Sequence, residues 1–519
     1  MQKTILSIDC GTQSTRAIIF SVKGEVLDKE QVFYEPYFSL QPGWAEQNAE
    51  TYWQSLCKAS LAIKSRNRRL FENIAGVGVT TLRDSMVNVD KQGNALRPLM
   101  TWLDQRKANS FYKPRFPLNL ALKAVGMDQT LQKMQREGKC NWIWQNQPEI
   151  WEHTYKFMQV SGFLNYKLTG EFADSIASQI GHIPFDYKKL KWGNPKKLMA
   201  FSSKIYPVEK EKLPELVEPG KEIGKISKIA SEQTGLKMGI PVIACGSDKG
   251  CETLGTGVID SSMASLSFGT TATVQTTVNK YMEPIPFMPS YPAVIPGKFN
   301  PEYEIFRGYW MITWFKNEFA YKEIEEAAKK GVSPEEVLNG LLTQSPPGSM
   351  GLVTQPYWSP GLSEPLAKGA MIGFGAVHKK AHVYRAVLEG LSFGLLEGLQ
   401  KIEKRGKLKF EKLAVSGGAS QSDEICRISA DVFNLPIVRG KTHESSGLGA
   451  AIITAFGTGI YNSIDEAVQK MVEYKFTFEP NRKSTELYKK LYVGVYKKMY
   501  KALEPLYKEI QEITGYPEN

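Results

Sequence analysis

The sequence predicts an α/β fold made of two duplicated halves, and two repeated strand–turn–strand segments support this prediction. Residues 3–16 form an apolar strand that runs into a turn rich in glycine and hydroxyl groups. Residues 264–277 repeat the order of apolar strand, glycine-containing turn and second strand in the other half of the chain. One such segment alone would be an ordinary hairpin. Two of them in separate halves indicate an internal duplication.

The first turn has the composition of a phosphate-binding loop. Gly11 allows the backbone to approach an anion closely. The hydroxyl groups of Thr12, Ser14 and Thr15 can donate to phosphate together with backbone N–H groups. Asp9 ends the strand, where its carboxylate can hold a magnesium ion through water. The segment has neither the lysine of a Walker loop nor a G-x-G-x-x-G before a helix, so it belongs to neither of those classes.

The second turn is Gly269-Thr270-Thr271, between apolar strands. Hairpins with phosphate ligands at their tips form the clefts of the actin-like (ribonuclease H-like) ATPases. We therefore expect two duplicated actin-like ATPase domains with a nucleotide in the interdomain cleft. The N-terminal domain is expected at residues 1–252 and the C-terminal domain at residues 253–519, with a glycine hinge near Gly255 or Gly257.

The other elements follow from hydrophobic periodicity. In the first half we expect strands at residues 4–9, 16–22 and 74–80, a helix at 49–64, and helical segments through 131–170. In the second half we expect strands at 264–268, 273–277 and 412–416, and a long helix at 381–402. Alternating strands and helices predict the α/β class.

Composition limits the functional classes. With 519 residues, 42% of them hydrophobic, the chain is expected to form two domains of about 250 residues each. The formal charge is +11, but the basic residues are spread along amphipathic segments, so no nucleic-acid partner is expected. The six cysteines have no zinc or disulfide spacing, which fits a reducing compartment. No export signal or long apolar run is present, so we expect a cytoplasmic protein with no membrane partner.

Between the two hairpins, an apolar strand ends at Gly246-Ser247-Asp248, which would present the Asp248 carboxylate to the predicted cleft. With this segment the chain resembles the FGGY carbohydrate kinases over nearly its whole length. The motifs, in the family's order, are D-C-G-T-Q-S-T-R (9–16), Q-P-G-W with E-Q (41–47), G-S-D-K (246–249), S-F-G-T-T (267–271), G-A-M-I-G-F-G-A-V-H-K-K-A-H-V-Y-R-A-V-L-E-G (369–390) and S-G-G-A-S-Q-S-D (416–423). Phe374 is a small departure, because an aliphatic residue is more usual there.

The resemblance implies a kinase that uses ATP and Mg²⁺, with Asp248 as the catalytic base and with Asp9 and Asp248 at the metal. An N-cap role is the alternative for Asp248. The candidate ATP ligands that the resemblance gives are Thr12, Gln13, Ser14, Arg16, Gly269, Thr270, Thr271, Gly417, Gly418, Ala419 and Ser422. For the glycine-rich turn at 417–419, a simple helix entry is the alternative.

The resemblance also places Arg83, Asp84, Trp102, Asp104 and Asp248 at the acceptor. A surface ion pair is the alternative for Arg83 and Asp84, and core packing for Trp102. Asp84 stands where glycerol kinases have glutamate, Thr273 where they have an aromatic residue, and the methionine-histidine pair of xylulokinases is absent.

The expected acceptor is therefore a small polyol or ketose, such as glycerol, a tetritol or a pentulose. Members of the family are often homodimers or homotetramers. The rival functions are an actin-like or chaperone-like ATPase and a catalytically silent sugar sensor on the same fold.

Overall fold

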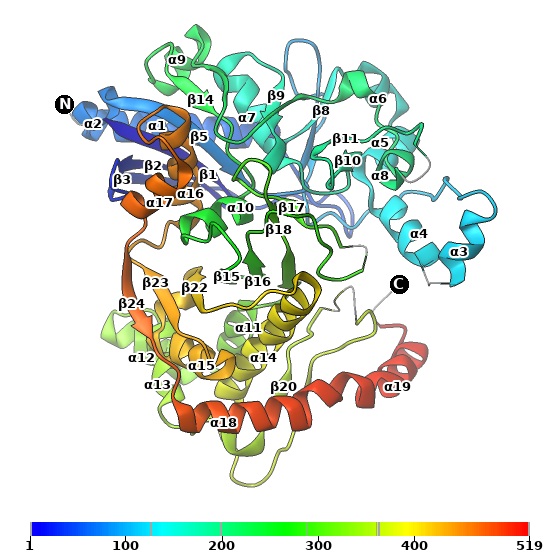
Figure 1. Cartoon of the computed structure of the whole chain (residues 1–519), viewed down its shortest axis with the longest axis vertical. Helices are drawn as coiled ribbons and strands as arrows, with labels where there is room; N and C mark the ends of the chain where they lie inside the picture. Colours follow the sequence, from blue (N-terminus) through cyan, green and yellow to red (C-terminus); the bar gives the residue numbers. More distant parts are fainter. Residues whose placement is uncertain are drawn as a thin grey trace. The chain divides into compact units, whose positions relative to one another are not determined.

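The computed structural model describes residues 3–124, 127–197, 200–286, 288–359, 361 and 364–516. The chain divides into two compact units, each described here by itself (Figure 1). Unit 1 comprises Met1–Gly255, Tyr291–Phe299 and Glu444–Val472, and unit 2 comprises Thr256–Ser290, Asn300–His443 and Glu473–Asn519.

The core of unit 1 is a six-stranded sheet in the order β13-β14-β5-β1-β2-β3. Its strands are β1 (Thr4–Cys10), β2 (Ser14–Ser21), β3 (Val26–Phe33), β5 (Ile74–Thr81), β13 (Glu222–Lys225) and β14 (Pro241–Ile243). β1 pairs antiparallel with β2 and parallel with β5, and every residue of β1 is buried. The predicted strands at 4–9, 16–22 and 74–80 are confirmed to within a few residues.

Helices cover both faces of this sheet. Because side chains alternate along a strand, Leu6 and Ile8 of β1 face α1 (Ala49–Arg66) in one core. Ile18 of β2 faces the opposite side, where Gly447 of α16 (Ser445–Gly457) packs against it. α16 in turn packs against α10 (Asp248–Gly255).

α16 and α10 approach so closely that their glycines cannot be replaced without movement. A Cβ atom built on Gly449 would lie 1.8 Å from the backbone oxygen of Cys251, and one on Gly255 would lie 1.9 Å from the backbone oxygen of Ser445. Because these glycines have no side chain, the backbone of each helix can contact the backbone of the other.

A second, four-stranded sheet in unit 1 has the order β4-β7-β6-β8, with β4 (Glu46–Gln47), β6 (Met86–Val89), β7 (Leu99–Met100) and β8 (Lys156–Gln159). The prediction of helix through 131–170 is wrong at β8. The helices there are α4 (Met127–Glu137), α5 (Lys139–Asn146), α6 (Pro148–His153) and α7 (Val160–Thr169). Residues 157–159 are buried and pair with β6, and such a short apolar run does not distinguish strand from helix by periodicity.

Unit 2 repeats the arrangement with a six-stranded sheet in the order β19-β16-β15-β22-β23-β24. Its strands are β15 (Met263–Phe268), β16 (Ala272–Thr276), β19 (Glu302–Ile305), β22 (Lys412–Ser416), β23 (Ile437–Gly440) and β24 (Tyr474–Phe478). β15 pairs antiparallel with β16 and parallel with β22, as β1 does with β2 and β5. The duplicated two-domain α/β fold is thereby confirmed. The predicted helix at 381–402 is α14 (Lys380–Gly406), which packs on α15 (Asp423–Phe433).

Short strands and helices complete the units. Unit 1 also has α2 (Arg68–Glu72), α3 (Leu118–Ala124), β9 (Ala173–Ser175), β10 (Phe185–Asp186), β11 (Lys191–Trp192), α8 (Phe201–Ile205), β12 (Glu215–Val217), α9 (Lys228–Thr234) and α17 (Ile464–Met471). Unit 2 also has α11 (Trp310–Phe319), α12 (Tyr321–Lys330), α13 (Pro334–Leu342), β20 (Val353–Gln355), β21 (Ala370–Ile372), α18 (Arg482–Leu491) and α19 (Lys497–Thr514). In the described part of the chain, no helix is both long and apolar enough to cross a membrane.

The units differ from the predicted division in one respect. The prediction gave two continuous domains, 1–252 and 253–519. Unit 1 instead extends to Gly255 and also includes two segments from later in the chain. The larger of these, Glu444–Val472, contains α16. It belongs to unit 1 because α16 packs on α10, β1 and β5, a long-range contact that no local pattern indicates.

The close contact between α10 and α16 gives a stability prediction. Gly449→Ala is expected to destabilise the protein by roughly 1–3 kcal/mol, because the added methyl group overlaps a backbone atom of α10. Gly340→Ala in α13 is the matched control, since nothing lies within 4 Å of its Cβ position. This control should be neutral or stabilising by up to about 1 kcal/mol. Urea unfolding of the two variants measures the difference, and equal effects would contradict the packing account.

Candidate functional site

The turn between β1 and β2 is held by hydrogen bonds within unit 1. The Gly11 N–H donates to Ser14 O at 2.9 Å, the Tyr34 hydroxyl donates to Gly11 O at 2.7 Å, and Gln31 Nε2 donates to Ser14 Oγ at 2.9 Å. Gly11 does not have a positive φ, and a Cβ there would meet only Ser14 O at 3.6 Å. The fold itself therefore does not require glycine at position 11, and the absence of a side chain there leaves space beside the turn.

The hydroxyl groups of Thr12 and Thr15 in this turn have different surroundings. The Thr15 side chain is fully buried and its Oγ1 contacts Cys10 Sγ and the Tyr34 hydroxyl, so it does not share the setting of Thr12. Thr12 Oγ1 accepts a hydrogen bond of 3.0 Å from Trp102 Nε1. An indole N–H can only donate. The Thr12 hydroxyl hydrogen is therefore left for another acceptor, such as a phosphate oxygen.

Arg16 joins two carboxylates beside this turn. Its Nη1 lies 3.1 Å from Asp9 Oδ2 and 3.6 Å from Glu444 Oε2. Glu444 also forms an ion pair with Lys29 at 2.7 Å. Glu444 immediately precedes α16, so a residue from late in the sequence supports the first turn. Sequence reasoning missed Glu444, and its place directly before the small-residue helix was the only signal.

Asp9 is 8% exposed. Burial raises its pKa to about 6; Arg16 opposes this rise, and the negative charges of Asp248 and Glu444 add to it. The cost of ionising a buried carboxylate near two others is the physical reason. Asp9 and Asp248 therefore lie close enough in unit 1 to influence each other.

Asp248 is the first residue of α10, which follows β14. Ser247, rather than Asp248, accepts a hydrogen bond through its side chain from the Gly250 N–H, at 3.3 Å. Asp248 Oδ1 accepts from the Lys249 N–H at 2.7 Å. Burial raises the pKa of Asp248, and the positive charges of Arg83 and Lys249 oppose that rise. The N-cap alternative for Asp248 is thus weakened, because the helix has a cap without it.

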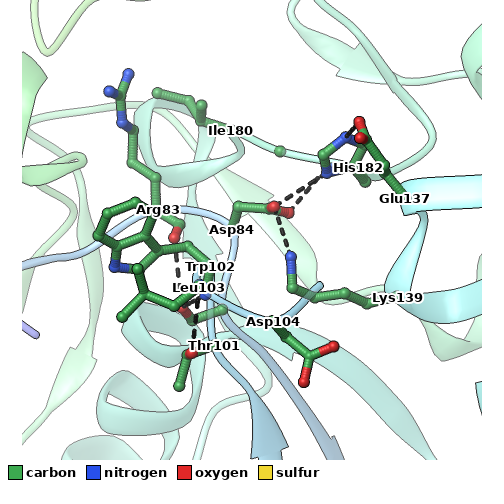
Figure 2. Close-up of polar contacts among 12 residues, drawn as sticks. Arg83, Asp84, Thr101, Trp102, Leu103, Asp104, Glu137, Lys139, Ile180 and His182 are labelled. Carbon is green, nitrogen blue, oxygen red and sulfur yellow. Dashed lines mark hydrogen bonds and ion pairs between the residues drawn. The ribbon is translucent and has the colours of Figure 1, made fainter. Parts of the chain in front are cut away.

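Asp84 has two partners that sequence reasoning missed (Figure 2). Lys139 Nζ donates to Asp84 Oδ2 at 2.6 Å, and His182 Nδ1 lies 3.0 Å from the same oxygen. The His182 backbone N–H donates to Oδ1 at 3.0 Å. Burial alone would raise the pKa of Asp84, but attraction to Lys139 and His182 lowers it well below its usual range. Asp84 is therefore a carboxylate, not a carboxylic acid.

The backbone around Asp84 is strained and tightly packed. Asp84 has a positive φ of 51°, which is uncommon for a residue with a side chain. A Cβ atom on Gly181 would lie 2.3 Å from Asp84 Oδ1, so only glycine fits opposite this carboxylate. The Arg83 side chain extends away from Asp84 in Figure 2, and its guanidinium lies 5.3 Å from the ring centroid of Tyr291. Arg83 and Asp84 therefore do not form the simple surface pair that was the alternative.

Asp104 lies in a buried ion network. Its Oδ2 accepts from Arg106 Nη2 at 2.6 Å and from the Ala45 N–H at 2.8 Å, and its side chain is 1% exposed. The Arg106 guanidinium lies over the Trp44 ring, 4.1 Å from its centroid. In Figure 2 the Asp104 carboxylate points away from Asp84. Both the motif at 41–47 and Asp104 thus have a structural role here, and a contact of Asp104 with the acceptor stays a prediction.

Unit 2 holds the other nucleotide candidates. The β15–β16 turn contains Gly269, Thr270 and Thr271, and Thr271 Oγ1 donates to Phe306 O at 3.2 Å. Gly417 has a positive φ of 84°, and a Cβ there would lie 3.0 Å from Gly269 N. The glycine-rich turn therefore lies directly against the hairpin turn within this unit.

The rest of the glycine-rich turn leads into α15. Gly418 and Ala419 form a short 3-10 turn, and nothing lies within 4 Å of a Cβ position on Gly418. Ser422 accepts a hydrogen bond from the Ile425 N–H and caps α15. The helix-entry alternative is thus accurate for Ser422, while Gly418 leaves open space.

A magnesium ion fits Asp9 and Asp248 by donor type. Magnesium in phosphoryl-transfer sites takes one or two carboxylates and completes its shell with water and phosphate oxygens. Asp9 is buried and Asp248 is half-buried. The pKa of each is raised, and a bound divalent cation would stabilise both ionised forms. In the described residues no group of three or more His, Cys, Asp or Glu side chains is placed to hold a metal ion.

Two family models match the chain. The N-terminal domain model of the FGGY family of carbohydrate kinases matches residues 4–255, and the C-terminal domain model matches residues 264–458. The chain is 28% identical to the uncharacterized sugar kinase YgcE of Escherichia coli K12, over 99% of this chain and 96% of that protein. It is 27% identical to a xylulose kinase of Lactococcus lactis (98% and 99% covered) and 26% identical to a gluconokinase of Bacillus subtilis (99% and 98%).

Solved structures share the fold. The gluconate kinase of Lactobacillus acidophilus superposes with a TM-score of 0.80 at 21% identity, covering 100% of this chain and 99% of that one. The glycerol kinase of Plasmodium falciparum with ADP gives 0.76 at 19% identity, covering 96% and 98%. Because the two family models together span most of its length, the chain belongs to the FGGY family of carbohydrate kinases.

Proposed function

We propose that the protein transfers the γ-phosphoryl group of ATP to a hydroxyl group of a small polyol or ketose. Its family membership makes it a phosphotransferase that acts on sugar hydroxyls. The observation that supports the proposal most is Asp248, a half-buried carboxylate with a raised pKa that is not needed to cap its own helix. Such a group is suited to general-base catalysis.

In the proposed mechanism, Asp248 removes the proton of the acceptor hydroxyl as its oxygen attacks the γ-phosphorus. The raised pKa makes Asp248 a stronger base than an ordinary aspartate. Arg83 and Lys249 place positive charge beside it, which limits the rise of its pKa. The acceptor is held near Arg83, Asp84 and Trp102.

Each unit has its own candidate ATP ligands. In unit 1 the phosphates are bound by Thr12, Gln13, Ser14 and Arg16, with Arg16 oriented by Asp9 and Glu444. In unit 2 the proposed ligands are Gly269, Thr270, Thr271, Gly417, Gly418 and Ala419, with Ser422 at the start of α15. Bound Mg²⁺, held by Asp9 and Asp248, would supply neutralisation of phosphate charge.

The proposal is tested by ADP formation from MgATP with glycerol, tetritols, ketopentoses and ketohexoses. One acceptor should raise turnover strongly, and Asp248→Asn should lower its kcat by roughly 10²–10⁴-fold because the base is lost. Asp186→Asn, a partly exposed carboxylate paired with Lys189, is the matched control and should be unaffected. Acceptor-independent hydrolysis alone would support the ATPase function, and binding without turnover would support the sensor.

The raised pKa of Asp9 gives a pH prediction. The value of about 6 implies that kcat/KM falls as the pH is lowered through about 6, because a protonated Asp9 no longer attracts Arg16 or a cation. The free energy of unfolding should depend on pH in the opposite direction. A carboxyl pKa above its usual value means that the folded state binds the proton more tightly, so stability from this group is greatest at low pH and is lost as the pH rises through about 6. A kcat/KM that stays constant down to pH 5 would contradict the predicted loss of activity.

The hydrogen bond from Trp102 to Thr12 predicts a selective effect. Trp102→Phe keeps an aromatic ring but removes the indole N–H, so Thr12 loses one partner at 3.0 Å. Losing such a bond costs about 0.5–1.5 kcal/mol, and KM for ATP should rise about 2- to 12-fold. Trp144→Phe, at a half-exposed indole against Phe111, is the control. The idea fails if Trp102→Phe leaves the KM for ATP unchanged in steady-state kinetics.

A further inference from the structure

Lys139 is a buried ammonium group whose hydrogen-bonding capacity is only partly used. Its side chain is 4% exposed. An ammonium carries three N–H donors. Within the described part of the chain, Lys139 Nζ has one hydrogen-bond partner, Asp84 Oδ2 at 2.6 Å. Two donors therefore remain, and a buried cation with unused donors is costly unless a ligand completes it.

The neighbours of Lys139 retain acceptor capacity. Asp84 Oδ2 receives Lys139 and His182 Nδ1, while Oδ1 receives the backbone N–H of His182, so Oδ1 keeps one free lone pair. A carboxylate only accepts, so His182 Nδ1 carries the hydrogen in this contact. With the hydrogen on Nδ1, we assign Nε2 as an acceptor; the Glu137 Oε2 atom lies 3.8 Å from it. Two donors and two acceptors are therefore available.

This set matches two neighbouring hydroxyl groups. Each hydroxyl oxygen can accept from Lys139 Nζ while its own hydrogen is donated, one to Asp84 Oδ1 and the other to His182 Nε2. Asp84 and His182 are the more exposed members, with side chains 17% and 29% exposed, so a ligand reaches the cluster from their side. In Figure 2 both Lys139 and His182 point at Asp84 from different elements.

Three lysines of the region already pair with carboxylates. Lys139 pairs with Asp84, Lys107 pairs with Glu137 at 2.9 Å, and Lys249 pairs with Glu252 at 2.8 Å. A carboxylate on the acceptor would place a further negative charge beside Asp84, and the cation that contacts Asp84, Lys139, is already paired. Like charges in a partly buried site are mutually destabilising. Neutral acceptors are therefore favoured over sugar acids.

We propose that Lys139, together with Asp84 and His182, binds a vicinal diol of a neutral acceptor and is the specificity-determining residue of the acceptor site. This inference rests on the proposed kinase function and narrows it, because it excludes aldonates. A site built to hydrogen-bond a hydroxyl strongly rejects an analogue that lacks it, since its buried polar groups are left unpaired.

The experiment compares acceptors of equal chain length. D-xylulose, xylitol and D-xylonate form one set, and D-fructose, D-glucitol and D-gluconate form the other. For the best neutral acceptor, each monodeoxy analogue is then assayed with the wild type, Lys139→Met and Lys139→Gln. Lys107→Met is the matched control, since its ammonium pairs with Glu137 and is 41% exposed. Lys139→Gln keeps two N–H donors and guards against poor folding of Lys139→Met.

The expected result is that a neutral acceptor exceeds the aldonate of its set at least tenfold in kcat/KM. Removal of one particular hydroxyl should lower kcat/KM at least 30-fold in the wild type but less than threefold in Lys139→Met, with partial recovery in Lys139→Gln. Such non-additivity is the signature of a direct contact. This ratio is insensitive to a loss of folded protein, which a purely structural role would cause.

Two results would overturn the inference while leaving the kinase function intact. One is a sugar acid as the best acceptor. The other is that the factors by which Lys139→Met and the removal of each hydroxyl lower kcat/KM simply multiply, so that the two changes act independently. If no acceptor in either set raises ADP formation, the proposed function itself fails, and the inference fails with it.

Discussion

The backbone contact between α10 and α16 is the constraint on which the site in unit 1 depends. Gly255 and Gly449 let the two helices touch through backbone atoms, and α16 also packs on β1 and β5. The N-terminus of α10 carries Asp248, and the residue before α16 is Glu444. Both helices therefore present a carboxylate near Asp9 at the end of β1, as the mutual effects on the pKa of Asp9 indicate.

This clustering of acids is unfavourable for folding and useful for chemistry. Burial and neighbouring negative charge raise the pKa of Asp9 and that of Asp248, so ionised forms cost free energy in the folded protein. Arg16 recovers part of that cost by lying between Asp9 and Glu444. Phosphoryl transfer requires a general base with a raised pKa and a carboxylate that binds a cation. The arrangement that destabilises the fold therefore matches the proposed function.

The sequence allowed the duplicated fold, both hairpin turns and the position of Asp248 after its strand to be predicted, because each depends on a short local pattern. The partners of Asp84 could not be predicted. Lys139 and His182 lie 55 and 98 residues away in the chain, and neither belongs to a motif. The role of Asp104 was also hidden, since its carboxylate accepts from the distant Ala45 N–H and its partner Arg106 pairs with the equally distant Glu46. Long-range packing, as for α16, leaves no local signal.

The proposed kinase transfers the phosphoryl group of ATP to a sugar hydroxyl and not to water. The most direct measurement is ³¹P NMR of the products of MgATP turnover with the best neutral acceptor. A new phosphate monoester resonance that grows in equal amount with ADP, with little inorganic phosphate, is the predicted result. Inorganic phosphate equal to ADP, with no ester signal, would contradict the account and identify the protein as an ATPase.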